Sequence, residues 1–242
     1  MKPPEIKQFE STDWPTMAAD LIQNSINNVL AKQGKCSVML TGGRSAARLY
    51  KAWRDLPAFQ QMTGVSFYFG DERCVPSDHT ESNYGMVMQT LFQHGVPAGC
   101  SVLRMEAEAE DRKVAAQRYA DLLPDSIDVL LLGVGEDGHI ASLFPNNASL
   151  QERKRRVIPI TGPKPPFERL TITPQVITKA RSVFVLATGS AKTAMLTTAL
   201  DNPNDIAALP ARLTLGGTWL MDRLPDPDDA FIKKWNFTGE VV

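Results

Sequence analysis

Short apolar runs alternate with amphipathic stretches along most of this chain. Residues 14–29 carry apolar side chains at the spacing of a helix, behind three candidate capping residues, Ser11, Thr12 and Asp13. The apolar run at 36–40 has the length of a strand, and a helical pattern resumes at 46–53. The further predicted strands are 65–69, 127–132, 157–160, 170–173, 182–187 and 218–221, and the further predicted helices are 83–91, 111–123, a short one that opens at Thr173-Pro174, and 191–200.

Strands that alternate with helices predict an α/β fold. Because helices cover both faces of a mostly parallel sheet in such folds, we predict a three-layer, Rossmann-like architecture. In the helix at 111–123, Ala115, Tyr119 and Leu122 are expected to share one apolar face. The chain has 242 residues, which suffice for a sizeable core, and we expect a single domain over residues 1–242. The Pro- and Asp-rich segment after Asp222 is expected to form a surface turn before a short terminal helix.

Four of the predicted strands end in a loop that contains glycine and that we expect to open a helix. These loops begin near Gly42, Gly70, Gly133 and Gly189. In open sheets of parallel strands, ligands bind beyond the carboxyl ends of the strands. The four loops are therefore predicted to converge on one site.

Three of these loops carry a basic residue that suits an anion. Gly42 and Gly43 allow the backbone to approach a phosphate closely at a helix amino terminus, where Arg44 adds a charge, although an ordinary tight turn would look the same. Arg73 could clamp an anion through paired hydrogen bonds, or could merely pair with a neighbouring carboxylate. Lys192 falls in the first turn of a predicted helix, which the helix dipole disfavours unless an anion binds there too.

The loop at 133–138 spells G-x-G-x-x-G, which is also the pattern of dinucleotide sites. Such a site needs a full helix after the third glycine and an acidic residue at the end of the next strand. Pro145 ends any helix early, and the strand at 157–160 is followed by no such acid. We therefore interpret the loop as a flexible frame for Asp137 and His139. Histidine has an ordinary pKa near ~6.5 and serves readily as a general base around neutral pH.

The composition narrows the classes of function. A formal net charge of −1 argues against a nucleic-acid binder, and the basic run at 153–156 is short enough to be a solvated turn. The longest apolar runs are strand-sized, and the first residues lack the pattern of a secretory signal, so we expect no membrane association. Three widely spaced cysteines suit a reducing compartment, which favours the cytoplasm. The three histidines and three cysteines show no metal-ligand spacing, so no metal site is predicted.

Six segments in this order resemble the 6-phosphogluconolactonase family: LTGGRS (40–45), FGDERCVPSDHTESNY (69–84), DVLLLGVGEDGHIASLFP (128–145), PKPPFERLTIT (163–173), TGSAK (188–192) and LPA (209–211). The second and third segments are long and specific. Related glucosamine-6-phosphate deaminases/isomerases resemble DGHIAFNEP, whereas this chain continues DGHIA with SLFP and lacks the glutamate. Two departures are Ala46, where the family usually has proline, and the stretch 211–222, which matches its pattern only loosely.

The resemblance implies hydrolysis of 6-phospho-D-glucono-1,5-lactone to 6-phospho-D-gluconate in the oxidative pentose phosphate pathway, without a cofactor. His139 would activate water, and Asp137 or Glu136 would orient the imidazole or the substrate hydroxyls. The implied substrate-binding residues are Gly42, Gly43, Arg44, Asp71, Arg73, Asn83, Ser142, Arg169 and Lys192. The alternatives are a deaminase/isomerase-like enzyme and a non-catalytic regulator that binds a sugar phosphate. The expected partner is a small phosphorylated sugar lactone, and the expected assembly is a monomer or weak homodimer.

Overall fold

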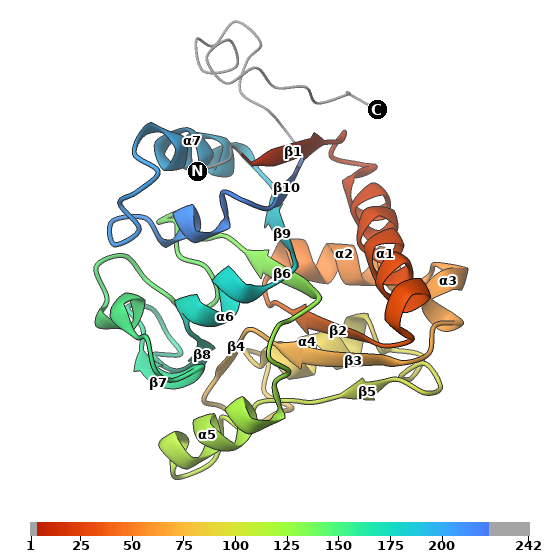
Figure 1. Cartoon of the computed structure of the whole chain (residues 1–242), viewed down its shortest axis with the longest axis horizontal. Helices are drawn as coiled ribbons and strands as arrows, with labels where there is room; N and C mark the ends of the chain where they lie inside the picture. The colour runs from red at the N-terminus through yellow and green to blue at the C-terminus, as the bar shows by residue number, and fades with distance from the viewer. Residues whose placement is uncertain (1–3, 223–242) are drawn as a thin grey trace, which may run out of the picture.

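The central sheet of this protein is parallel throughout. The structure is a computed structural model that describes residues 4–222, so the terminal helix expected after Asp222 lies outside the described residues. The strands follow the order β1-β10-β9-β6-β2-β3-β5, and each neighbouring pair is parallel (Figure 1). Their bounds are β1 (Glu5–Gln8), β2 (Cys36–Leu40), β3 (Val65–Phe69), β5 (Ser101–Val102), β6 (Val129–Gly133), β9 (Ser182–Ala187) and β10 (Thr218–Met221).

Helices bury both faces of this sheet. In β2, Val38 and Leu40 pack on one face while Met39 packs on the other, and all three are inaccessible to solvent. A strand with both faces buried reads as a continuous apolar run, as CSVML does. One face is covered by α1 (Trp14–Gln33), α2 (Arg44–Arg54), α3 (Pro57–Gln60) and α4 (Asn83–Thr90), and the other by α5 (Arg112–Leu122), α6 (Pro174–Lys179) and α7 (Ser190–Asp201). The predicted three-layer α/β fold is confirmed.

A second, smaller sheet was not predicted. It consists of β4 (Asp71–Arg73), β8 (Glu168–Ile172) and β7 (Val157–Thr161), paired antiparallel in that order. The predicted strand at 170–173 therefore belongs to this sheet and not to the central one. The chain reaches it directly from β3, because the Gly70 amide still bonds to Leu40 while its carbonyl accepts from Ile172.

Other expectations about single elements were wrong. Only the loops after β2 and β9 open directly into a helix: the loop after β3 first forms β4, and residues 134–147 contain turns and isolated bridges. Leu122 is 51% exposed, whereas Ala115 and Tyr119 are buried on α5. Asp13 occupies the cap position of α1 but makes no capping hydrogen bond through its side chain.

The strand order reverses in the middle of the sheet. From β2 the chain adds β3 and β5 on one side, and from β6 it adds β9 and β10 on the other. β2 and β6 pair directly, with Val38 opposite Val129. The loops that leave their carboxyl ends diverge to opposite faces, and such a reversal is where open α/β sheets bind ligands.

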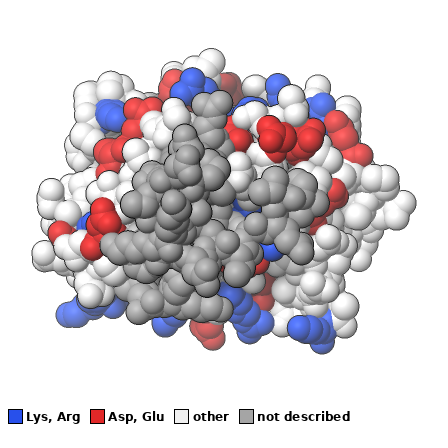
Figure 2. All heavy atoms as spheres, turned by 90° about the horizontal axis from the view of Figure 1, so that it is seen from above, with Lys and Arg blue, Asp and Glu red and all other residues white. Residues whose placement is uncertain are grey.

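The sequence predicts no membrane association, and the described helices and surface bear on this prediction. Within residues 4–222, no helix has the length and apolar character that crossing a membrane requires. On the face shown in Figure 2, Lys and Arg side chains are interspersed with Asp and Glu side chains among the described residues.

Candidate active site

A cavity of about 590 Å³ opens where the strand order reverses. All four predicted loops contribute to its wall, so the expected convergence is what the structure shows. The predicted site residues that line it are Gly42, Gly43, Arg44, Asp71, Arg73, Asn83, Glu136, His139, Arg169 and Lys192. Asp137 and Ser142 do not line the cavity, but their side chains form hydrogen bonds with residues that do.

His139 is held at Nδ1 by a carboxylate. Its Nδ1 lies 2.5 Å from Asp137 Oδ1, and both side chains are partly exposed. This hydrogen bond is the main reason why the pKa of Asp137 is lowered to about 2. Gly135 makes the arrangement possible, because a Cβ there would collide with the imidazole and with Asp137. With Nδ1 occupied, Nε2 is the nitrogen left for chemistry.

An aromatic ring fixes one face of the same imidazole. The Phe144 ring centroid lies 4.8 Å from that of His139, and Phe144 is buried. The guanidinium carbon of Arg169 sits 5.5 Å from the Phe144 centroid, a favourable cation–π arrangement. His139 is therefore restrained by a hydrogen bond at Nδ1 and by a tilted aromatic ring beside it.

A buried polar network supports the floor of the cavity. The Asp71 carboxylate accepts hydrogen bonds from Ser142 Oγ at 2.5 Å and from Asn83 Nδ2 at 3.1 Å. Arg169 Nη1 in turn donates to Ser142 Oγ at 3.3 Å. Gly42 packs so closely that a Cβ would overlap the Asn83 amide, which explains the glycine at this position. Ser142 is fully buried, so it reaches the cavity through Asp71 and Arg169.

Glu72 is a structural residue that the sequence reasoning did not identify. It is buried and accepts hydrogen bonds from the Ser82 hydroxyl and from the backbone amides of Arg73, Asn83 and Tyr84. Burial raises its pKa above the ordinary value, while those amides oppose the shift. Glu72 thereby anchors the start of α4, which carries Asn83. No spacing in the sequence marks it, because its partners are backbone amides.

Two helix amino termini point basic residues toward the cavity. Gly43 and Gly189 cap α2 and α7 with φ of 100° and 93°, a region that favours glycine. The first amides of each helix have no partner within the helix, and Arg44 and Lys192 lie in these first turns. Burial lowers the pKa of Lys192, and the nearby carboxylates of Glu136 and Asp137 oppose that lowering.

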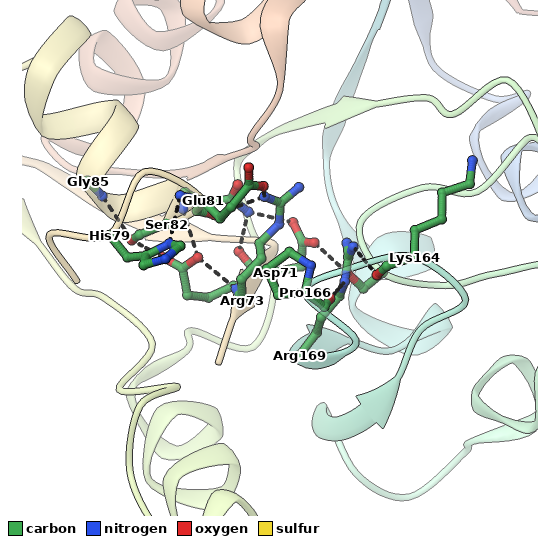
Figure 3. A network of polar contacts seen from close by, with 12 residues as sticks. Asp71, Arg73, His79, Glu81, Ser82, Gly85, Lys164, Pro166 and Arg169 are labelled. Carbon is green, nitrogen blue, oxygen red and sulfur yellow. Dashed lines mark hydrogen bonds and ion pairs between the residues drawn. The ribbon is translucent and has the colours of Figure 1, made fainter. Parts of the chain in front are cut away.

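Arg73 does not pair with Asp71 or Glu72 through its side chain. Its Nη1 donates to the Glu81 carbonyl at 2.9 Å and lies 3.5 Å from the Glu81 carboxylate (Figure 3). Its Nε is buried and has no partner among the described residues. The guanidinium is thus fixed at one end and keeps donor capacity where it lines the cavity.

Three further lining residues were missed. Ser45 and Thr188 are 2.6 Å apart through their hydroxyls and join the start of α2 to the end of β9. Arg48 donates to the Ser11 carbonyl and lies over the Trp14 ring. Arg48 follows Arg44 by one helical turn, and this spacing could have revealed it. Within residues 4–222, no group of three or more His, Cys, Asp or Glu residues could hold a metal ion.

Comparisons with known proteins agree with this geometry. A family model described as glucosamine-6-phosphate isomerases/6-phosphogluconolactonase matches residues 10–220. A 6-phosphogluconolactonase from Rattus norvegicus is 36% identical over 226 residues, covering 86% of each chain. One from Homo sapiens is 38% identical over 202 residues, covering 76% of each chain. The solved structure of 6-phosphogluconolactonase from Trypanosoma brucei is similar with a TM-score of 0.74 at 27% identity, covering 97% of this chain and 99% of that one.

Proposed function

This chain belongs to the glucosamine-6-phosphate isomerase/6-phosphogluconolactonase family, and we propose that it hydrolyses 6-phospho-D-glucono-1,5-lactone in the oxidative pentose phosphate pathway. One observation carries the proposal. His139 bonds to Asp137 through Nδ1 and lines the same cavity as Arg44, Arg73 and Lys192. A base and a set of cations in one cavity suit an ester that carries a phosphate.

The chemistry begins with a water molecule at the lactone carbonyl. His139 Nε2 takes a proton from this water as its oxygen attacks C1, and the carbonyl oxygen becomes an oxyanion. Asp137 accepts the Nδ1 hydrogen bond, which keeps the basic lone pair on Nε2 and stabilises the imidazolium that forms. When the intermediate collapses, the C1–O5 bond breaks and His139 returns the proton to the departing O5. The product is the open-chain acid, which releases its carboxyl proton to solvent and becomes the carboxylate.

The cations at the helix termini have a separate role. The 6-phosphate would lie against Gly42, Gly43 and Arg44, with Arg73 and Lys192 completing the charge balance. Phosphate binding far from C1 orients the carbonyl before the attack, which is an efficient way to accelerate a reaction that proceeds slowly unaided. Amides of the glycine loops are candidate donors to the oxyanion.

The floor of the cavity would recognise the sugar ring. Asp71 and Asn83 line the cavity and are fixed by Ser142 and by each other, so they can accept and donate hydrogen bonds to hydroxyl groups without reorganising. Phe144 falls where isomerase-like sequences place their glutamate, and it packs against His139. That glutamate belongs to ring-opening chemistry, so its replacement favours the lactonase.

The test is a lactonase assay on purified protein, corrected for spontaneous hydrolysis, beside an assay for ammonia released from glucosamine 6-phosphate. We expect catalysed hydrolysis and no ammonia. Ammonia release would favour the isomerase branch of the family. Thermal stabilisation by 6-phosphogluconate without turnover would indicate a regulator that binds the sugar phosphate.

The setting of the enzyme is part of the same proposal. Cys36, Cys74 and Cys100 form no disulfide, which is consistent with a reducing compartment such as the cytoplasm. We propose that residues 1–242 act as one domain and as a monomer or weak homodimer. Light scattering across a concentration series measures the assembly.

A further inference from the structure

The hairpin between β7 and β8 lies beside the active site and carries a lysine in its turn. Residues 162–167 connect these antiparallel strands, and Gly162 donates to the Phe167 carbonyl at 2.6 Å to close the turn. Lys164 lies in this turn and is exposed. Neither the sequence motifs nor the mechanism above assigns it a role.

Arg169 ties this turn to the catalytic wall. Its Nε donates to the Pro166 carbonyl at 2.9 Å and its Nη2 to the Lys164 carbonyl at 3.2 Å. Its third contact, from Nη1, goes to Ser142 Oγ. All three nitrogens of the buried Arg169 guanidinium therefore donate hydrogen bonds to other protein atoms, and one of these bonds holds the backbone of Lys164.

The turn also packs directly against the ring that restrains His139. Gly162 lies so close to Phe144 that a Cβ would come within 2.9 Å of its Cε2 atom. Phe144 packs in turn on the imidazole at 4.8 Å. The path from Lys164 to His139 thus runs through Gly162 and Phe144.

The Lys164 side chain extends away from this anchoring network (Figure 3). Among the described residues it has no hydrogen bond or ion pair, in contrast to the backbone carbonyl beneath it. The Lys164 charge affects two residues of the site. It helps to lower the pKa of Lys192, although burial has a larger effect there. It also helps to lower the pKa of Asp137, although His139 has a larger effect there. The Lys164 ammonium group therefore lies near both Lys192 and Asp137.

Lys164 and Lys192 repel each other as like charges, although Glu136 and Asp137 offset part of this effect at Lys192. A dianion between them removes that repulsion, so the pair is suited to a phosphate. We propose that Lys164 is a further ligand of the substrate's 6-phosphate, held beside the cavity by the turn that Arg169 anchors. This proposal rests on the lactonase function proposed above.

The experiment compares Lys164→Ala and Lys164→Arg with Lys154→Ala, an exposed lysine outside the site. For Lys164→Ala we expect KM for the phosphorylated lactone to rise about tenfold, with kcat within about twofold, because one charge-assisted contact is lost. The Kd for 6-phosphogluconate, measured by calorimetry, should rise equally. Lys164→Arg should restore most of the affinity, and Lys154→Ala should match the wild type.

A second substrate separates the possible outcomes. With unphosphorylated glucono-1,5-lactone, Lys164→Ala and wild type should have the same kcat/KM. An unchanged KM for the phosphorylated lactone would overturn the proposal, and so would an equal loss on both lactones, since that would place Lys164 at the reacting carbonyl. If the wild type hydrolysed neither lactone, the proposed function would fail, while 6-phosphogluconate binding would still test Lys164.

Discussion

At the scale of residues, the site depends on pairs in which one side chain fixes another. His139 is fixed by Asp137 and Phe144, and Asp71 by Ser142 and Asn83. All of these residues except Phe144 could be predicted, because they lie in Gly-rich loops and in long, specific motifs. Two further residues could not be predicted, although both lie in the family segments. Glu72 bonds mainly to backbone amides, and Lys164 lies beside the site only because β7 and β8 pair as a hairpin that Arg169 anchors.

The Asp137–His139 pair predicts a pH-dependent stability. The pKa of Asp137 is lowered to about 2 in the folded protein, chiefly by the hydrogen bond from His139. A carboxyl with a lowered pKa stabilises the fold above its unfolded pKa of ~3.9 and loses that contribution as the pH falls through the folded value. The difference in unfolding free energy between wild type and Asp137→Asn should therefore be complete above about pH 5 and shrink between about pH 4 and pH 2.

Urea unfolding at a series of pH values measures this difference. The control is the same comparison in a His139→Asn background, where the hydrogen bond is absent and the dependence should largely disappear. A difference that does not change between pH 5 and pH 2 would show that Asp137 is not stabilised by His139.

At the scale of elements, strand ends are held by buried tyrosines. Tyr50 of α2 accepts a hydrogen bond from the Thr41 amide at 3.0 Å and donates to the Thr41 carbonyl at 2.9 Å. Tyr119 of α5 does the same at Phe69, the last residue of β3. Both rings are buried. These contacts fix the points where β2 and β3 give way to the loops of the site.

Tyr50→Phe should therefore affect both stability and catalysis. It leaves the buried Thr41 amide and carbonyl without a partner, which should cost about 1–3 kcal/mol of unfolding free energy. Because Thr41 leads into Gly42 and Gly43, KM for the phosphorylated lactone should rise as well. Tyr68→Phe, at a hydroxyl beside Ser66 and outside the cavity, is the matched control. Equal stability and KM in the two variants would refute the role of Tyr50.

The elements that the sequence did not predict are the shortest ones. β4 and β5 contain three and two residues, too few for a periodic pattern to emerge. β1 has four residues with mixed burial, and only its pairing with β10 defines it as a strand. The loop after β6 was expected to begin a helix, but its polar groups bond across the loop instead, as Gly135 does with the His139 carbonyl.

At the scale of the whole molecule, the position of the site follows from topology. Parallel strands bring their carboxyl ends to one edge, and this alone allowed the four loops to be placed together in advance. The reversal of strand order between β2 and β6 opens the cavity at their junction, where the Gly133 amide bonds to Thr41 Oγ1 at 3.2 Å. The antiparallel sheet that contains Arg169 and carries Lys164 in a turn was not predicted, because β4 has only three residues and pairs with β8 far along the chain.

The proposed phosphate-binding groups and the proposed sugar-binding floor lie around one imidazole, so the most direct measurement is the kcat of His139→Asn on the phosphorylated lactone. Circular dichroism and thermal unfolding first establish that the variant is folded. The account predicts that kcat falls by about 10²–10⁴-fold, the usual contribution of a general base, while KM changes little. A folded His139→Asn protein that hydrolyses the lactone at the wild-type rate would contradict it.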